Sequence, residues 1–342
     1  MRYIVSSFFV LISLISTAQT KPDFFPEDLN LESSEGQIRC YCKPGVRYNS
    51  PSRGLELSYG LISAGTYEPE NGSDLIRPYS AFDRWQQFEA NLKVPLILKE
   101  DFKMLLGYKY YSEAFSFSHI GVDFNQVFQN LDNQTLKKNA FSLIINKALN
   151  EKNYLLFRAR YLSNGNYKGW LKLGGDYAIY NFVGLYAFKP NEDLEWGIGV
   201  NVSRSFRRTA ALPFLVYNKT FNRKWGIESV FPAFVFGRYN FNTNNILLFG
   251  FEYNSDSYRM KFEDEFQQSF DYAFNHSELI SAVRLEHRFA DWVWANLKVG
   301  YQTNFSSDFE SKSTEPSFFV EPTDGLYFHF GIFISPPDDH DD

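Results

Sequence analysis

His276, Ser277 and Glu278 form the run in this sequence that comes closest to catalytic chemistry. A serine becomes a nucleophile when a histidine accepts its proton and a third group orients that histidine. Adjacent residues of an extended strand point to opposite faces, so His276 and Ser277 can share a proton only where the backbone turns. We therefore interpret the run as a junction between a loop and a strand, and we predict no catalytic residues and no enzyme.

His329 is flanked by two aromatic residues, Phe328 and Phe330. In a strand it faces the opposite side from both rings. A packed interior histidine is therefore favoured over a ligand or a proton relay. The other histidines of the chain have no evident partners, and the sequence predicts no cofactor and no defined metal site.

The only two cysteines are Cys40 and Cys42. A disulfide between residues so close along an extended chain is geometrically strained, which rules out a disulfide framework. A metal site, pairing with another chain and two incidental thiols are the alternatives, and incidental thiols are favoured.

Charged residues that alternate with apolar ones are a more informative set. Those expected to share an interior face include Lys93, Lys109, Arg158, Arg160, Arg284, Glu286, Arg288 and Lys298. Basic residues outnumber acidic ones on that face. They either link the interior through ion pairs, or line a water-filled passage that would favour anions.

Two expected loops are acidic. One carries Asp256, Glu263, Asp264, Glu265 and Asp271, and the other carries Asp308, Glu310, Glu315, Glu321 and Asp324. A solvated surface explains both loops. Calcium or magnesium bridging to lipid phosphates is the alternative, but neither loop has the ligand spacing of a defined site.

A period of two in hydrophobicity positions these charges. Between Trp85 and Val94, Leu92 and its alternate neighbours are apolar, whereas Asn91 and its alternate neighbours are polar. Such alternation is typical of strands with one apolar and one polar face. The pattern recurs from about residue 54 to 335, and many runs approach the roughly 9 to 11 residues that a tilted membrane strand needs.

The connections between the runs favour a barrel over a sandwich. Short turns, such as Lys99 to Asp101, mostly alternate with longer links, such as 118–138 and 258–276. Bacterial barrels alternate short periplasmic turns with longer outer loops in this way. The run from Trp225 to Asn240 fits only if it folds back at Pro232, which gives 14 strands. We predict an all-β, antiparallel transmembrane β-barrel of 12 to 14 strands.

Both ends of the chain differ from this repeating region. Arg2, an apolar run and a small-residue stretch ending at Ala18 predict a cleaved signal peptide over 1–18. The polar segment 19–53 is expected to be a loosely held periplasmic lead-in, with a plug inside the barrel as the alternative. The barrel then covers 54–335, and an acidic tail covers 336–342.

The composition agrees with an outer-membrane location. Aromatic residues make up 19% of the chain while its mean hydropathy is −0.33. Barrels combine aromatic girdles with a polar interior, which reconciles these two values. The net charge of −6 argues against nucleic acid as a partner. Outer-membrane lipid is the expected partner instead.

The run Gly325, Leu326, Phe328 and Phe330 resembles the assembly signal at the end of outer-membrane barrels. That resemblance implies recognition by the barrel assembly machinery.

The stretch from Leu212 to Met260 resembles uncharacterised, porin-like outer-membrane barrel families. Leu212-Pro213, Trp225-Gly226-Ile227-Glu228, Pro232 and Arg238-Tyr239-Asn240-Phe241-Asn242 carry the resemblance. It implies the fold and no catalytic residues. From the residues themselves, a passive channel for small polar or anionic solutes is the first hypothesis. A closed structural or adhesive barrel that acts through its outer loops is the second.

Overall fold

A computed structural model describes residues 44–69, 79–122, 125–206, 208–264, 266–313 and 315–335. The predicted signal peptide, Cys40, Cys42 and the acidic tail lie outside the described residues. Among the residues described, no helix is long and apolar enough to cross a membrane.

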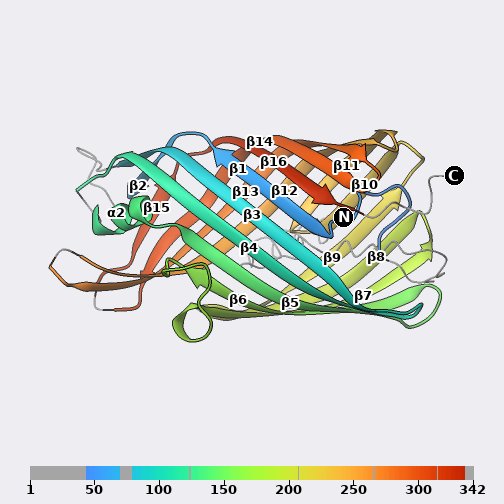
Figure 1. Ribbon diagram of the computed structural model, residues 1–342, viewed down its shortest axis with the longest axis horizontal. Helices are drawn as coiled ribbons and strands as arrows, with labels where there is room; N and C mark the ends of the chain where they lie inside the picture. The colour runs from blue at the N-terminus through green and yellow to red at the C-terminus, as the bar shows by residue number, and fades with distance from the viewer. Residues whose placement is uncertain are drawn as a thin grey trace, which may run out of the picture.

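One antiparallel sheet forms almost the whole molecule (Figure 1). Its strands are β1 (Leu55–Ile62), β2 (Gly65–Pro69), β3 (Ser80–Leu98), β4 (Phe102–His119), β5 (Leu136–Ala148), β6 (Asn153–Gly165), β7 (Ala178–Asn191), β8 (Leu194–Arg204), β9 (Thr209–Thr220), β10 (Trp225–Phe231), β11 (Phe234–Asn242), β12 (Asn245–Glu263), β13 (Ser269–Ala290), β14 (Val293–Ser311), β15 (Phe318–Pro322) and β16 (Gly325–Ile334). Helix α2 (Asn125–Asn133) and the short 3-10 helix η1 (Gly175–Tyr177) lie between strands.

The sheet closes on itself because β1 pairs with both β16 and β3. Strands β2 and β15 pair with each other and extend the wall beyond β1 and β16, so 14 strands form the barrel proper. The predicted all-β barrel and its even strand number are confirmed.

The short turns gather at one end of the barrel, which we call the inner end. In four of them the side-chain oxygen of an asparagine accepts a hydrogen bond from the backbone N–H two residues later, at 2.9 Å each time. Such Asx turns reverse the chain tightly. The four residues are Asn150, Asn191, Asn222 and Asn242. Short turns mark the periplasmic side of bacterial barrels.

The predicted fold-back at Pro232 is confirmed, since β10 ends at Phe231 and β11 begins at Phe234. Pro213, by contrast, lies within β9 and pairs with Val200 of β8. On its other side β9 pairs with β10 only from Leu215 onward. Pro213 therefore occupies an edge where its missing N–H breaks no ladder.

The outer end of the barrel differs from the expected long loops. Strand β12 continues to Glu263 and β13 begins at Ser269, so most of the predicted loop 258–276 is a long hairpin. Asp256, predicted to lie in an acidic loop, is a buried residue of β12. The reason is that alternation of side chains in β12 and β13 continues beyond the apolar outer band. Pairing between the two strands satisfies their backbone N–H and C=O groups there.

Strands β7 to β11 do not reach this outer end. Beyond Glu252, β12 no longer pairs with β11, and its Arg259 meets Gly165 of β6 instead. The wall therefore narrows to a smaller ring, in which α2, β2 and β15 lie together at the end opposite the short turns (Figure 1). A ring of this size can be filled by side chains.

The outer face of the barrel is apolar. Leu92 and Leu297 are 42% and 51% exposed, whereas Asn91 and Asn296 beside them are 4% and 1% exposed. Exposed aliphatic and aromatic side chains on every long strand extend this band around the wall. A soluble sandwich would bury this face, so the exposed band belongs in lipid.

The interior is less uniformly polar than expected. Aromatic and aliphatic side chains from α2 and the strands of the smaller ring pack into one cluster, which we call the outer aromatic core. A second apolar cluster lies along the inner faces of β5, β6, β7, β9 and β10. At the start of β6 both faces are apolar, with Leu155 exposed outside and Leu156 buried inside. Polar and charged side chains line the cavity between these clusters.

Candidate functional site in the barrel interior

The stretch 44–53, part of the expected loose lead-in, is folded inside the inner end of the barrel. The backbone N–H of Gly45 donates to both carboxylate oxygens of Glu195 at 3.0 Å. The N–H of Ser50 donates to Glu228 at 2.8 Å. These residues lie on β8 and β10, on opposite sides of β9. We call 44–53 the inserted segment; here the structure differs from the expected loosely held lead-in.

Arg47 fixes the segment to the turn between β7 and β8. Its guanidinium donates two hydrogen bonds to Asp193, from Nε at 2.9 Å and from Nη2 at 2.7 Å. The hydrogen bonds from Arg47 hold the pKa of the Asp193 carboxyl below its ordinary value, and the same contact raises the pKa of Arg47. The geometry is bidentate, the stronger form of such a pair.

A fully buried arginine holds the middle of the segment. Arg238 of β11 donates to Glu228 at 3.0 Å and to Thr220 at 2.9 Å. Gly226 makes room for it, since a Cβ at that position would lie 2.4 Å from Nη2 of Arg238. The segment therefore rests on a preformed polar seat rather than on loose contacts.

A cavity of about 170 Å³ lies directly against this segment, with Ser50, Pro51 and Arg53 in its lining. That is about ten times the space that one ordered water needs. Its charged lining is balanced rather than basic. The acidic residues are Glu56, Glu89, Glu228, Glu252, Asp256 and Glu278, and the basic ones are Arg53, Lys93, Lys109, Lys138, Arg284 and Lys298.

Ion pairs cross-link this central cavity. Lys109 pairs with Glu89 at 3.1 Å, Lys298 pairs with Glu252, and Arg53 pairs with Glu286 at 2.8 Å. Of the residues predicted from the sequence, the cavity brings together Lys93, Lys109, Arg284 and Lys298.

The remaining predicted interior charges lie elsewhere. Glu286 is fully buried behind the cavity and is paired with Arg53 and Arg284. Arg158 and Arg160 are buried on β6, 1% and 8% exposed, outside the cavity lining. Arg288 is partly buried near the inner end, where its Nε donates to Asn244 at 2.7 Å.

The closing strand β16 contains the run predicted as an assembly signal. Leu326, Phe328 and Phe330 are exposed on the apolar outer face, and Gly325 begins the strand. His329 faces inward, as alternation requires, and lines the central cavity beside the ring of Tyr327.

His276 is buried in the middle of β13, not at a loop junction as the sequence suggested. Its ring faces Glu113 of β4, whereas the hydroxyl of Ser277 lies 3.1 Å from that of Ser306. The two residues point to different neighbours, so they do not form a nucleophile with its base. Glu278, two residues further along β13, lies on the same inward face as His276 and lines the cavity.

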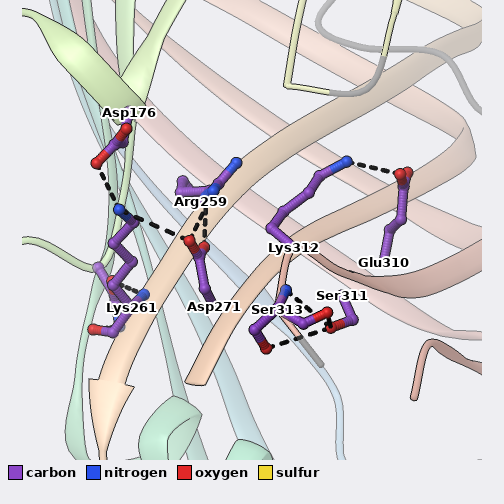
Figure 2. Close-up of polar contacts among 9 residues, drawn as sticks. Asp176, Arg259, Lys261, Asp271, Glu310, Ser311, Lys312 and Ser313 are labelled. Atoms are coloured by element: carbon purple, nitrogen blue, oxygen red, sulfur yellow. Dashed lines mark hydrogen bonds and ion pairs between the residues drawn. The ribbon is translucent and has the colours of Figure 1, made fainter. Parts of the chain in front are cut away.

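Charge pairs hold the outer rim where the wall narrows (Figure 2). Arg259 donates to Asp271 at 2.6 Å within the β12–β13 hairpin. Lys261 reaches from the same hairpin to Asp176 in the β6–β7 link and lies 3.6 Å from Asp271. Figure 2 shows Lys261 between the two carboxylates. This network covers the edge of β12 that β11 leaves without a partner.

Residues 55–335, the whole described barrel, match the family described as "Domain of unknown function (DUF6268)". The chain belongs to this family. Its closed wall, apolar outer band and short inner turns make this DUF6268 protein a β-barrel of the bacterial outer membrane.

A comparison with curated proteins gives no match to the DUF6268 chain. Among solved structures, it is similar to the COG4313 outer membrane channel from Pseudomonas putida F1, at 10% identity and a TM-score of 0.41 over 89% of this chain and 100% of that one. It is also similar to the P. putida toluene transporter TodX, at 8% identity and a TM-score of 0.39 over 94% and 97%. A FadL homologue of P. aeruginosa gives 7% identity and a TM-score of 0.40 over 82% and 90%.

Sequence reasoning missed the parts of the interior that do not follow strand alternation. Arg47 and Arg53 lie in a polar, proline-containing stretch that has no periodicity, so no local pattern placed them inside the barrel. Their charge was the only local sequence feature that could have indicated a role in the interior. Asp256 and His276 lie beyond the apolar band, where the length of the strands could not be predicted.

Proposed function

We propose that this protein is an outer-membrane channel for small polar solutes and that the inserted segment closes it at its inner end. The observation that supports this most is the central cavity, which is charged, large enough for several waters, and bounded by Ser50, Pro51 and Arg53. Its inner boundary is thus a segment outside the sheet, which can leave without breaking the wall.

The electrostatics of the segment fit a removable closure. Arg47 pairs with Asp193 where both side chains are about two-fifths exposed, at 39% and 40%. Exposed pairs contribute about 0.2–1 kcal/mol each, so this pair breaks at little cost, whereas Gly45 and Ser50 are held by buried hydrogen bonds to Glu195 and Glu228.

Liposome swelling tests this proposal with a charge reversal. Arg47→Glu places a third negative charge beside Asp193 and Glu192. We therefore expect liposomes with this variant to swell faster in a small neutral sugar than liposomes with the unmodified protein. Lys152→Glu is the matched control, because Lys152 is an exposed lysine in another inner turn, between β5 and β6. Equal swelling for Arg47→Glu and Lys152→Glu would contradict the proposal.

The predicted preference for anions is a finer part of the same proposal. The central cavity has matched charges, so a preference would come from basic residues deeper in the wall, at Arg158 and Arg160. Fixed charges raise the local concentration of the opposite ion. Replacing both by Gln should shift the reversal potential in a salt gradient toward zero, and a cation-selective unmodified pore would contradict the idea.

A closed structural or adhesive barrel is the second candidate. The outer aromatic core favours it, because Phe128 and Leu131 of α2 and the aromatic side chains around them fill the space inside the smaller ring of strands. Such a barrel would act through its outer rim, and neither the unmodified protein nor Arg47→Glu would then swell liposomes.

We also propose that the closing strand carries the contact with the assembly machinery. Phe328 and Phe330 are exposed on β16, which pairs with β1 to close the barrel. Surrounding lipid then covers the same side chains after insertion.

A further inference from the structure

Three side chains of metal-binding type meet where the central cavity ends against the outer aromatic core. Glu113 comes from β4, Asp256 from β12 and His276 from β13. Each offers one ligand atom, and these atoms lie within 4.8 Å of one another. In the sheet, β4 is separated from β13 by β14, β16, β1 and β3, so the group joins distant parts of the wall.

His276 is the residue that points to a ligand. It is 6% exposed, and neither ring nitrogen has a hydrogen-bond partner within the described part of the chain. Its Nε2 lies 3.6 Å from Oε1 of Glu113 and its Nδ1 lies 4.0 Å from Oε2 of Glu278. Both distances are too long for hydrogen bonds. A buried imidazole without a hydrogen bond is costly, and a bound ion between it and the carboxylates would satisfy it.

The spacing fits two ligands of one ion. Zinc lies about 2.0–2.2 Å from histidine nitrogens and carboxylate oxygens, so two tetrahedral ligands are about 3.4 Å apart. The 3.6 Å between His276 and Glu113 is close to that value. A bound ion would therefore satisfy Nε2 with small movements.

The charges of the group favour a divalent cation. Glu113, Asp256 and Glu278 supply three carboxylates around His276, and the ammonium of Lys138 pairs with Asp256. With the imidazole neutral, as it must be when it binds a metal, these described residues sum to two negative charges. Buried charge without compensation is strongly unfavourable, and a 2+ ion would balance it.

Neighbouring side chains hold the ligands in place. Trp85 Nε1 donates to Oε2 of Glu113 at 3.2 Å, and the Tyr258 hydroxyl donates to Oε1 at 2.9 Å. The His276 ring stacks on Phe274, with ring centres 5.2 Å apart. Such partners orient the ligands of metal sites and exclude water.

We propose that Glu113, Asp256 and His276 bind one divalent transition-metal ion, of the zinc class, inside the barrel. Imidazole is a preferred ligand of transition metals, whereas calcium and magnesium favour all-oxygen sites. The ion ties β4 to the β12–β13 hairpin, and Lys138 competes with it for Asp256. The site does not depend on whether the barrel conducts.

Cobalt titration tests the site directly. Full-length protein in detergent is treated with a chelator and titrated with Co²⁺, whose visible absorption reports protein ligands. We expect one equivalent of Co²⁺ to give an absorption band that Zn²⁺ abolishes by displacement. His276→Gln should lose the band, whereas His329→Gln, which removes another inward-facing histidine, should keep it. No band in the unmodified protein, or an equal band in His276→Gln, would overturn the proposal.

Two further variants keep the test decisive. Lys138→Gln removes the competing ammonium, so it should tighten Co²⁺ binding by on the order of tenfold; weaker binding would contradict the arrangement. Heat-modifiable mobility on gels checks that each variant is folded. If His276→Gln does not fold, Asp256→Asn takes its place with the same expected loss of the band, and an unchanged band there would equally overturn the proposal.

Discussion

At the scale of single residues, neighbours along one strand meet different surroundings. Leu297 of β14 is exposed on the outer band, whereas Lys298 beside it lines the central cavity and pairs with Glu252. Strand alternation alone produces this difference. The sequence was sufficient to predict it, because apolar and polar residues alternate strictly from Ala295 to Lys298.

Replacing Leu297 by Arg should impair assembly far more than replacing Lys298 by Arg. A charge near the middle of the bilayer costs about 2–4 kcal/mol, whereas an interior arginine at 298 keeps the existing charge beside Glu252. The fraction of folded protein inserted into lipid vesicles measures the difference. Equal yields for the two variants would mean that the inside and outside faces are wrongly assigned.

Acidification should loosen the inserted segment through Asp193. Its pKa is lower in the folded protein than its ordinary value of 3.8, because Arg47 donates to it. The stabilisation is therefore complete above pH of about 4 and is lost as the pH falls through the folded pKa. Hydrogen exchange of the amides of 44–53, relative to intrinsic rates, should rise in that range.

Asp193→Asn should show the same faster exchange already at neutral pH, by roughly up to fivefold, since an exposed pair contributes about 1 kcal/mol or less. Asp101→Asn is the control, because Asp101 pairs with Lys147 in another inner turn. A similar increase in hydrogen exchange of 44–53 in both variants would show that the increase does not come from the pair between Asp193 and Arg47.

At the scale of elements, the lengths of the strands decide the shape of the interior. Strands β10 and β11 are short, while β12, β13 and β14 extend far beyond them, so the outer end closes into a smaller ring between β6 and β12. Alternation revealed the strands and Pro232 revealed the hairpin. It could not reveal the ring, because the contact of Arg259 with Gly165 joins residues far apart in sequence.

Helix α2 was not predicted, because its nine residues are mostly polar and only one face is apolar. Phe128 on that face is 2% exposed and stacks on Tyr67, with ring centres 5.8 Å apart. Phe128→Ala should therefore destabilise the outer aromatic core by about 3–5 kcal/mol, whereas Gln126→Ala on the exposed face should change little. Urea unfolding in detergent measures both, and a loss below 1 kcal/mol for Phe128→Ala would contradict the packing.

At the scale of the whole molecule, the barrel is a wall around three compartments: the inserted segment, the charged cavity and the outer aromatic core. The apolar outer face requires lipid, and the 14 strands close without a free edge except where the rim network of Lys261 covers β12. The fold class followed from the sequence, since period two and uneven connections recur along the chain. The inserted segment did not, because nothing local distinguishes a polar stretch inside a barrel from one in solvent.

Single-channel recording in planar bilayers tests the central claim, that the inserted segment closes a polar passage. The unmodified protein should be silent for long periods with brief openings, and Arg47→Glu should open more often at the same unit conductance, because the wall is unchanged. Lys152→Glu should behave as the unmodified protein does. A steady open current from the unmodified protein, or bilayers that stay silent with both proteins, would contradict the account.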